Sequence, residues 1–536
     1  MTESPSPLNR QNWATALSGY PGALPVLINN MLLYGATIGY TGGLQSVISA
    51  NLASANEDPS TITAQLMMDL HLGRVSEHHG SHPFFCSPLG LVPKSDGGWR
   101  RIHHLSYPNG ESVNDLIPDM WSGLHYTRID EVFDLVRGAG RGATIIKKDL
   151  KDAFRMIAVA PHQRWLLGFQ WQGRFYHENC LPFGLRTAPL LFNLLAEGLQ
   201  WVLQSLLHWE HLTHYLDDFI YVLPSSTPIS VIETAERDYV ELTNALGLLR
   251  NDSKDASGTK VEALGIEIDT VAMTARISAR KIAKARSLVS TALTKGNLTQ
   301  LQTQKIIGFL SFCASVVTLG RTYLRRLWDY ASTFARPQSF RKLTAGAVAD
   351  LTWWRDLLPR FNGVRLIDNR SRQTYHLFTD ASNYAMGAFW YAGSPADGDW
   401  PQFSRKVPQQ QSFSYSYEPC ERRLHINVTE ILVIELAFER WGTLWEHGTV
   451  IAHTDNTTAE AGLKGGTTKS AGMEQLRNIL LLAATRDTAL HACRITTEAN
   501  TLADALSRLD WKTVADFTSN WQIPSHTNRS QSLSTC

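Results

Sequence analysis

The spacing of apolar and polar residues changes several times along the chain, and each change predicts a different kind of element. Apolar runs of strand type end at Asp149 and flank the acidic pair in HLTHYLDDFIYVLP, residues 211–224. Two further runs flank DGG at 96–98, which is typical of a hairpin turn. Helical spacing then runs from Pro189 to Leu207. Strands and helices mixed in this order predict an α+β fold.

A second module is predicted beyond residue 374, where the pattern begins again. YHLFTDAS and MGAFWYAG alternate as strands do, TVIAHTD is strand-like, and NVTEILVIELAFERW and MEQLRNILLLAATRD have helical spacing. This alternation predicts an α/β module. A chain of 536 residues is also too long for one hydrophobic core, since domains of about 150 residues suggest three or four units.

Pattern and composition together divide the chain into six segments. They are a low-charge helical extension (1–75), an α+β segment (76–275), a basic helical segment (276–360), a polar linker (361–373), the α/β module (374–510) and a flexible tail rich in Ser, Thr and Asn (511–536).

Charge is distributed unevenly. The formal net charge is only +1, and 43% hydrophobic with 18% charged residues is the balance of a folded globular protein. From Arg276 to Lys342, however, thirteen Lys or Arg residues stand against a single acid, Asp329, a local net charge of +12. A solvated helical face would explain this. Apolar residues at helical spacing in the same stretch favour packed helices that present cations to a nucleic acid.

Cysteine usage and the first residues predict an intracellular protein, cytoplasmic or nuclear and not secreted. The six cysteines are scattered without a CxxC pair, and MTESPSPLNR lacks the basic start and apolar run of a signal peptide. Residues 11–56 carry no charge, but Asn and Gly interrupt them, so no membrane span is expected.

Two adjacent acids, Asp217 and Asp218, lie inside a strongly apolar strand pattern. Buried neighbouring carboxylates repel each other unless a cation lies between them. An exposed hairpin turn is the simpler alternative. Because Asp149 also ends a strand, the three acids could together hold two Mg²⁺ ions, which take oxygen ligands and support nucleotidyl transfer.

At these residues the chain resembles the reverse transcriptases. The motifs, in order, are LGLVPKSDGGWRRIHHLSYP (89–108), LKDAF (150–154), LPFGLRTAPLLF (181–192), YLDD (215–218) and ALGIEID (263–269). The resemblance implies a right-hand polymerase, with fingers and palm at 76–275 and a thumb or connection at 276–360. It also implies an RNA template, a DNA primer and dNTPs as substrates.

The same resemblance implies roles for single residues. Asp149, Asp217 and Asp218 would be the catalytic metal ligands, and Phe154 would lie beneath the sugar of the incoming nucleotide. The remaining candidates would bind substrate: Lys94 and Arg100 the triphosphate, Phe183 and Gly184 the base pair, and Lys254 would donate a proton to pyrophosphate.

A second acidic set lies in the module from 374 to 510. Its members are Asp380, Glu430, Asp455 and Asp504. Singly, each acid is as readily explained as a helix cap or a surface charge. Their order and elements resemble the RNase H fold, in which four acids bind two Mg²⁺, with Mn²⁺ as the alternative, and cut RNA. Glu435 and Glu439 are expected to be exposed helix positions.

Together these modules predict an enzyme that copies RNA into DNA and degrades the RNA strand of the RNA–DNA hybrid. RRIHHLSYP with ESVND, together with LRTAPLLFNLLAE, looks most like DIRS-type retrotransposons, which are related to gypsy-like elements. TDAS and ADALSR resemble the RNase H domains of both gypsy-like and DIRS-type elements. A recombinase or integrase would then be encoded on a separate chain. The alternative is a domesticated, inactive retroelement protein that only binds nucleic acid.

Overall fold

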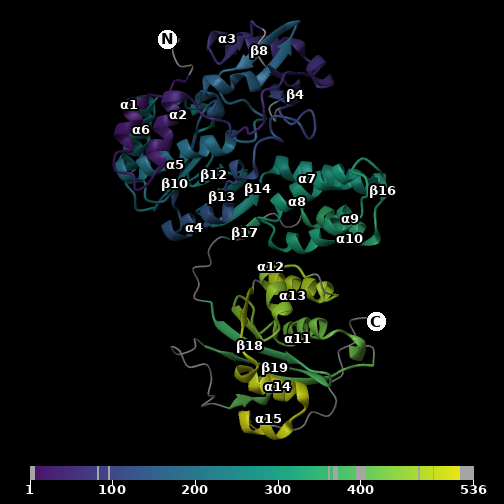
Figure 1. Ribbon diagram of the computed structural model, residues 1–536. Helices are drawn as coiled ribbons and strands as arrows, with labels where there is room; N and C mark the ends of the chain where they lie inside the picture. The colour runs from purple at the N-terminus through teal and green to yellow at the C-terminus, as the bar shows by residue number, and fades with distance from the viewer. Residues whose placement is uncertain are drawn as a thin grey trace. The chain divides into compact units, whose positions relative to one another are not determined.

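The computed structural model describes residues 6–80, 84–93, 97–359, 363–365, 372–393, 406–419, 421–468, 471–486 and 488–519. They form two compact units, Met1–Thr274 and Ala275–Cys536. The mixed α and β composition predicted from the sequence is confirmed in both units (Figure 1).

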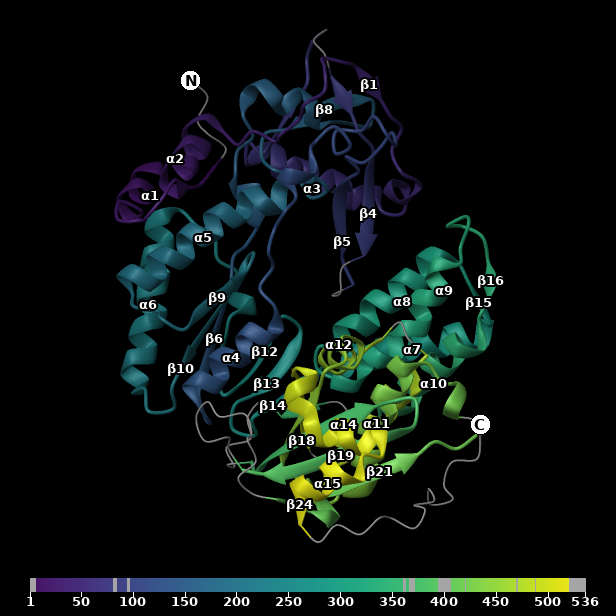
Figure 2. The same ribbon diagram turned by 60° about the horizontal axis from the view of Figure 1, so that its bottom comes forward.

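The first unit is built around a four-stranded sheet. Its strands, in spatial order, are β11 (Ala256–Gly258), β6 (Thr144–Asp149), β10 (Asp218–Leu223) and β9 (Leu212–Tyr215), and every neighbouring pair is antiparallel. Residues 219–223 of β10 are all buried, which explains the continuous apolar run seen in the sequence. Figure 2 shows the central strands side by side with the helices that accompany them. These helices are α4 (Ile129–Ala139), α5 (Ala188–Leu206) and α6 (Ile229–Leu246).

A second sheet of the first unit has the order β1-β3-β7-β8-β2. The bounds are β1 (Val47–Ile48), β2 (Val75–Glu77), β3 (Phe85–Cys86), β7 (Gly168–Trp171) and β8 (Arg174–Glu178). The predicted hairpin around DGG is present as β4 (Leu89–Pro93) paired antiparallel with β5 (Trp99–His103). A third pair, β12 (Lys260–Ala263) and β13 (Ile266–Asp269), forms around ALGIEID.

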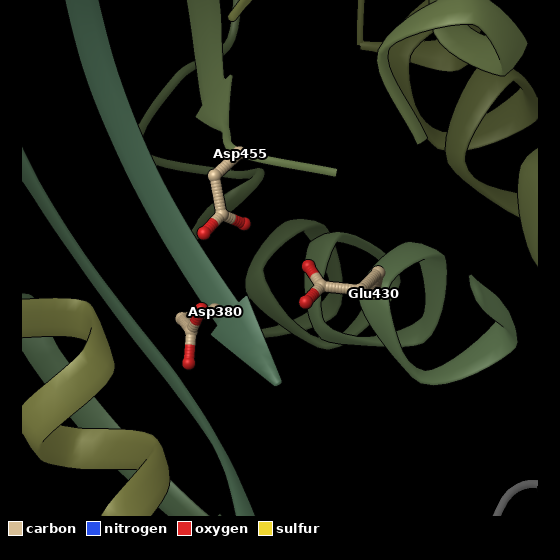
Figure 3. Close-up of side chains that lie close together, drawn as sticks. All are labelled: Asp380, Glu430 and Asp455. Carbon is tan, nitrogen blue, oxygen red and sulfur yellow. The ribbon is translucent and has the colours of Figure 1, made fainter. Parts of the chain in front are cut away.

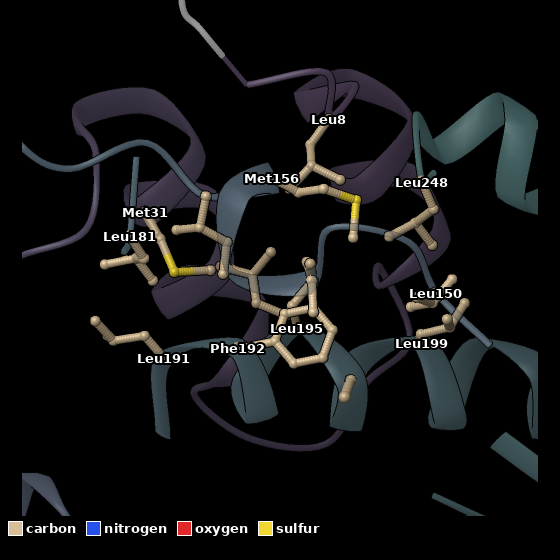
Figure 4. Close-up of a cluster of buried hydrophobic side chains, with 14 of the residues drawn as sticks. Leu8, Met31, Leu150, Met156, Leu181, Leu191, Phe192, Leu195, Leu199 and Leu248 are labelled. Atoms are coloured by element: carbon tan, nitrogen blue, oxygen red, sulfur yellow. The ribbon is translucent and has the colours of Figure 1, made fainter. Parts of the chain in front are cut away.

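The N-terminal helices are part of the core of this unit. They are α1 (Arg10–Ala16), α2 (Leu24–Tyr34) and α3 (Pro59–His71). Trp13 is 1% exposed, and its Nε1 donates to the carbonyl of Leu246 on α6 at 3.0 Å. Leu8 and Met31 lie in the same apolar cluster as Phe192 of α5 (Figure 4). The part of the predicted extension from Leu8 to Ile38 thus contributes apolar side chains to the main core, whereas Ile62 and Leu66 of α3 pack in a second cluster with Phe169.

The second unit begins with four helices that hold most of the basic segment. They are α7 (Ala279–Lys295), α8 (Gln300–Cys313), α9 (Arg325–Ser332) and α10 (Ala345–Leu357). Thr299 and Thr344 cap α8 and α10 by accepting backbone N–H hydrogen bonds, which satisfies donors at the helix starts. Two short strands, β15 (Asn297–Leu298) and β16 (Arg341–Lys342), pair antiparallel, and β14 (Thr274–Ile277) and β17 (Gly363–Arg365) flank these helices in sequence.

The rest of this unit is a five-stranded mixed sheet covered on both faces. Its order is β21 (Ser412–Ser416), β19 (Ala385–Ala392), β18 (Thr374–Ala381), β22 (Thr449–Thr454) and β23 (Ala489–Arg494). The pairs β21–β19–β18 are antiparallel, and β18–β22–β23 are parallel. Leu377 and Phe378 are neighbours on β18 but belong to different apolar clusters, because side chains alternate between the faces of a strand.

Helices cover the two faces of this sheet. Their bounds are α11 (Ile426–Trp441), α12 (Thr457–Gly465), α13 (Met473–Thr485) and α14 (Thr501–Arg508). Helix α11 packs on β18 and β19 with α13 beside it, and α14 packs on the other cluster.

The first part of the predicted flexible tail at 511–536 is folded in the structure. Residues Trp511–Phe517 form helix α15, and Thr518–Ser519 form β24, which pairs with β20 (Val407–Pro408). The Asp510 carboxylate accepts the backbone N–H of Thr513, and Val514 is fully buried in the cluster with α14. Polar composition alone had suggested a loose tail, whereas an apolar stripe holds this helix in place. The remainder of the tail, and most of the linker at 361–373, lie outside the described residues.

Within the described residues, the helices are all too short or too polar to span a bilayer.

Candidate active sites

The first acidic site lies at one end of the central sheet in the first unit. Asp149, the last residue of β6, is directly opposite Asp218, the first residue of β10. Residues opposite each other in an antiparallel pair share a face, so both carboxylates lie on the same side. The carbonyl of Asp217 accepts the backbone N–H of Leu150 at 3.0 Å. The structure therefore brings together the three acids that the sequence placed at two strand ends.

The turn between β9 and β10 presents the second acid of this site. Leu216 has a φ of 52°, in the left-handed region that is costly for a residue with a branched side chain. The strand ladder on both sides holds it there, from Tyr215 opposite Asp218 to Leu212 opposite Tyr221. A short YLDD turn therefore places both acids at the tip of a hairpin whose second strand, β10, is buried beyond Asp218.

Two lysines contact these acids. Lys147 Nζ lies 3.2 Å from Asp218 Oδ1, and Lys254 Nζ lies 3.3 Å from Asp149 Oδ1. Lys254 thus lies beside Asp149, and its role as a proton donor stays a prediction. Lys147 was not singled out, although it lies two residues before Asp149 on the same strand, so its side chain had to share the face of that acid.

Burial perturbs the acids of the hairpin. Desolvation, with smaller contributions from Asp218 and Asp149, raises the pKa of Asp217 to about 6. Desolvation also raises the pKa of Asp218, and Lys147 opposes this shift. Carboxylates that are costly to ionise gain from a nearby cation, so this donor set fits a divalent metal that takes oxygen ligands.

The predicted nucleotide-side residues form a chain of contacts. The rings of Phe154 and Phe183 lie 5.2 Å apart between centroids, and the Arg100 guanidinium lies 5.0 Å from the centroid of Phe183. Phe154 also meets Phe192 of α5 edge-on. Arg100 is exposed, and both rings are half-buried. Lys94 lies outside the described residues.

Gly184 is required at its position by two features. Its φ is +114°, and a Cβ built there would lie 2.0 Å from the carbonyl oxygen of His103. Two hydrogen bonds hold the backbone of this loop. The backbone N–H of His103 donates to the carbonyl of Phe183 at 3.2 Å, and Asn114 Nδ2 donates to the carbonyl of Gly184 at 2.8 Å. The loop with Phe183 is therefore fixed to β5.

The second acidic site lies at the end of the five-stranded sheet. Asp380 comes from β18, Glu430 from the first turns of α11, and Asp455 follows β22 (Figure 3). One carboxylate oxygen from each of the three acids lies within 4.8 Å of one from each of the other two. Among the residues that the structure describes, this is the one group of three or more potential metal ligands at such spacing. The three carboxyl groups lie close together in Figure 3, and one oxygen from each could bind a shared cation.

Burial and mutual repulsion make two of these acids, Asp380 and Glu430, hard to ionise. Desolvation, then Asp380 and Asp455, raise the pKa of Glu430 to about 9. Desolvation raises the pKa of Asp380 to about 6, while a hydrogen bond from the Ser507 hydroxyl lowers it. Ser507 was not predicted. It lies in ADALSR, three residues after Asp504, and such a hydroxyl can be recognised only once α14 is placed on the sheet.

Asp504 is not part of the group of three. Its Oδ1 accepts a hydrogen bond from Arg508 Nε at 2.7 Å, one turn further along α14. Its charge nevertheless contributes to the raised pKa of Asp380, so it lies near the other acids. Thr497 also reaches the site, since its hydroxyl donates to Asp455 Oδ2 at 2.7 Å.

The expectation that Glu435 is an exposed helix position was wrong. Glu435 is 2% exposed, and its Oε1 accepts a hydrogen bond from Asn478 Nδ2 of α13 at 2.8 Å. Every residue of α11 from Val428 to Phe438 is buried, so a polar position such as Glu435 lies against a neighbouring helix instead of solvent. Glu439, one turn on, is exposed as expected.

Comparison with known proteins finds a match for the middle part of the first unit. A family model described as reverse transcriptase (RNA-dependent DNA polymerase) matches residues 92–268. The Pro-Pol polyprotein of Simian foamy virus type 1 is 29% identical over 182 residues, which cover 34% of this chain and 14% of that protein. The Pro-Pol polyprotein of Feline foamy virus is 23% identical over 310 residues, covering 57% and 24%. The chain thus spans less than a quarter of the curated relatives it matches.

Solved structures of a foamy viral protease-reverse transcriptase are also similar to this chain. The complex with dsDNA is 16% identical, with a TM-score of 0.48 over 91% of this chain and 98% of that one. The complex with an RNA/DNA hybrid is 15% identical, with a TM-score of 0.47 over 92% and 64%. From the family match and the Pro-Pol relatives, residues 92–268 are a reverse transcriptase domain of the retroviral and retroelement Pro-Pol type.

Proposed function

We propose that this protein is an RNA-directed DNA polymerase that also cleaves the RNA strand of the hybrid it makes. The observation that carries the proposal is the presence of two separate acidic sites. One lies in the reverse transcriptase domain, and the other lies in a mixed five-stranded sheet of the second unit. An RNA–DNA hybrid made at the first site is the substrate that the second site requires.

At the first site, Asp149, Asp217 and Asp218 would hold two Mg²⁺ ions, with Mn²⁺ as an alternative. When bound at either site, such ions activate the attacking oxygen and stabilise the charge of the leaving group. Lys147 and Lys254 hold Asp218 and Asp149 in place through their ion pairs. Lys254 is 60% exposed beside Asp149, so it can also donate a proton to pyrophosphate as it leaves.

The remaining residues of the first site position the incoming dNTP. Arg100, exposed and always charged, binds the triphosphate together with Lys94. Phe183 and Gly184 support the new base pair, and Gly184 lets the backbone approach because it has no side chain. Phe154 lies under the sugar, where its ring excludes a 2′-hydroxyl.

At the second site, Asp380, Glu430 and Asp455 would hold the cations of an RNase H reaction, and Asp504 would complete the set from α14. The sheet order, with three antiparallel and three parallel strands sharing β18, supports an RNase H-like domain at 374–510. We assign 76–275 to fingers and palm and 276–360 to a thumb or connection.

The basic helices of the second unit are proposed to bind the phosphates of the hybrid. Lys281 and Lys284 of α7 lie over the rings of Phe312 and Phe309 of α8, at 5.1 and 4.9 Å from the centroids. A duplex held by its phosphates is recognised by shape and not by sequence. The partners are therefore an RNA template, a DNA primer and their hybrid.

The biological setting is an intracellular retroelement. Cys86, Cys180 and Cys313 are buried free thiols, which suits a reducing compartment, cytoplasmic or nuclear. The motifs RRIHHLSYP and ADALSR support a DIRS-type element related to gypsy-like ones, whose recombinase or integrase is on another chain. A domesticated protein that only binds nucleic acid would have no use for two buried acidic sites.

The test is an assay that follows both reactions at once. A labelled DNA primer is annealed to an RNA template with a different label, and primer extension and RNA release are measured together. Asp217→Asn should abolish extension and leave hybrid cleavage largely intact, and Asp455→Asn should do the reverse, because each site holds its own cations. Binding of the hybrid without either reaction in the wild type would favour the domesticated binder. Loss of both reactions in one folded variant would contradict two separate sites.

A further inference from the structure

Four charged side chains, of which Asp69 is the most exposed at 14%, form a closed ring in the first unit. The acids are Asp69 on α3 and Glu178 on β8, and the bases are Arg101 on β5 and Arg155 in the 3-10 turn Ala153–Met156. The side chain of Glu178 is 1% exposed, and those of the two arginines are 8% exposed. Charged groups buried to this degree persist only when they are paired.

Each arginine contacts both acids. Arg101 Nη2 donates to Asp69 Oδ2 at 2.8 Å and to Glu178 Oε1 at 3.2 Å. Arg155 Nη1 donates to Glu178 Oε2 at 2.6 Å, and its Nη2 lies 3.1 Å from Asp69 Oδ2. Burial alone would raise the pKa of Glu178, but Arg155 and Arg101 hold it below its ordinary value.

The residue before each arginine belongs to the proposed nucleotide site. Arg100 precedes Arg101, and Phe154 precedes Arg155. Adjacent side chains of an extended strand point to opposite faces, so fixing Arg101 in the ring directs Arg100 the other way. The guanidinium of Arg100 and the ring of Phe154 then both meet Phe183.

Strand β5 also contacts the loop that carries Phe183 and Gly184. His103, two residues after Arg101 on β5, donates its backbone N–H to the carbonyl of Phe183, and Gly184 packs directly on the His103 carbonyl. Strand β5 therefore carries Arg100, which is proposed to bind the triphosphate, Arg101 of the ring, and His103, whose backbone holds Phe183. Movement of β5 relative to Arg155 would change the distance between Arg100 and Phe154.

We propose that the ring of Asp69, Arg101, Glu178 and Arg155 is a positioning device that sets the spacing of Arg100 and Phe154, and with it the selection of deoxyribose over ribose. The inference rests on the polymerase function proposed above. Buried ion pairs add little net stability but impose one geometry, and the planar fork of arginine can bridge two carboxylates where lysine cannot.

The test is sugar selection in the full-length protein. The ratio of kcat/KM for dCTP to that for CTP is measured on one RNA template for the wild type, Arg101→Lys and Glu178→Gln. Arg101→Lys keeps the charge and is the variant expected to fold. We expect the ratio to fall about tenfold in both, with a higher KM for dCTP, because misplacing a substrate-binding group by about 1 Å can cost on the order of a hundredfold in rate. RNA cleavage by the second unit should not change.

A matched control is available in the second unit. Asp350 is a buried acid that Arg477 Nη2 contacts at 2.9 Å and Arg326 Nη1 approaches at 3.9 Å, so Asp350→Asn also breaks a buried charge cluster. It should lower the Tm and leave the dCTP to CTP ratio unchanged.

The outcomes separate this inference from the polymerase proposal. If wild type extends primers but folded Arg101→Lys keeps its ratio within about twofold, the positioning role is overturned while the polymerase stands. A fall in the ratio that Asp350→Asn reproduces also overturns it, since general destabilisation would then explain both. A wild type that cannot extend a primer overturns both proposals.

Discussion

Single acidic residues show how the environment of a side chain changes its chemistry. Glu430 and Glu439 lie on the same helix, yet the first is 3% exposed among other carboxylates and the second is exposed. The pKa of Glu430 is raised to about 9, because burial and the nearby Asp380 and Asp455 oppose its ionisation. Its behaviour with pH should therefore differ from that of an ordinary glutamate.

The raised pKa of Glu430 predicts a pH-dependent stability in the absence of divalent metal. Between its ordinary pKa of 4.5 and about 9, the folded protein keeps a proton that the unfolded chain releases, so stability falls as the pH rises through this window. Glu430→Gln should remove most of this fall and, at pH 9 in EDTA, stabilise the protein by a few kcal/mol. Calorimetry of the wild type and Glu430→Gln from pH 5 to 9 measures this change in the free energy of unfolding.

Glu439→Gln is the control for this prediction, since its side chain is solvated on the same helix. Mg²⁺ should raise the Tm of the wild type at high pH and have little effect on Glu430→Gln. An equal Tm difference between wild type and Glu430→Gln at every pH would show that Glu430 does not titrate in this range.

Phe154 carries a prediction about sugar selection. Its ring is fixed between Phe183 and Phe192, and forcing an extra oxygen into a packed site costs about 1–3 kcal/mol, or roughly ten- to a hundredfold in selectivity. Phe154→Val should raise incorporation of CTP relative to dCTP, measured as the ratio of kcat/KM on one template. If Phe154 is only a core residue, both incorporations fall together and the ratio stays constant.

At the scale of elements, the basic segment is not uniformly available to a ligand. Arg325 pairs with Asp329 at 2.8 Å on α9, and Arg326 approaches the buried Asp350. Helix α7 differs, because Arg280, Lys284 and Arg286 are exposed along it. The sequence identified the excess of cations, and the structure indicates which helix presents them.

This difference predicts how salt should act on hybrid binding. Replacing Arg280 and Arg286, two exposed cations of α7, by Gln should weaken binding. It should also reduce the slope of log K against log salt by about 0.9 for each phosphate that is no longer neutralised, if the hybrid behaves like a duplex. Fluorescence anisotropy in EDTA, over a range of salt, measures the slope. Arg325→Gln should change it less, because that cation already has a partner. An unchanged slope in the α7 variant would mean that this helix is a solvated face.

At the scale of the whole molecule, the two acidic sites belong to different compact units. Each has buried acids from elements of its own unit, so neither needs a residue of the other to hold a cation.

The two sites should nevertheless respond alike to a change of metal. Replacing Mg²⁺ by Ca²⁺ should stop both extension and cleavage, because the larger ion takes more ligands and relaxes the octahedral geometry. The measurement is the two-label assay in each metal, with Mn²⁺ as the control that should support both reactions. Extension that continues in Ca²⁺ would argue against the proposed metal role of Asp149, Asp217 and Asp218.

The sequence by itself determined the elements and the residues that carry charge within them. Strand periodicity placed Asp149 and Asp218 at strand ends, and motif order identified the reverse transcriptase domain. These features are local, because they depend on neighbours within a few positions along the chain. The same strand periodicity also places Lys147, two residues before Asp149, on the face of that acid.

Only the tertiary structure decided which distant residues meet. The ring of Asp69, Arg101, Glu178 and Arg155 joins residues far apart along the chain, the Ser507 hydroxyl reaches Asp380 from α14, and Glu435 is buried by α13. Such contacts depend on how helices and sheets pack, and a buried arginine has the same local sequence signature as an exposed one. The charges could be read from the sequence, but the pairs that neutralise them are set by packing.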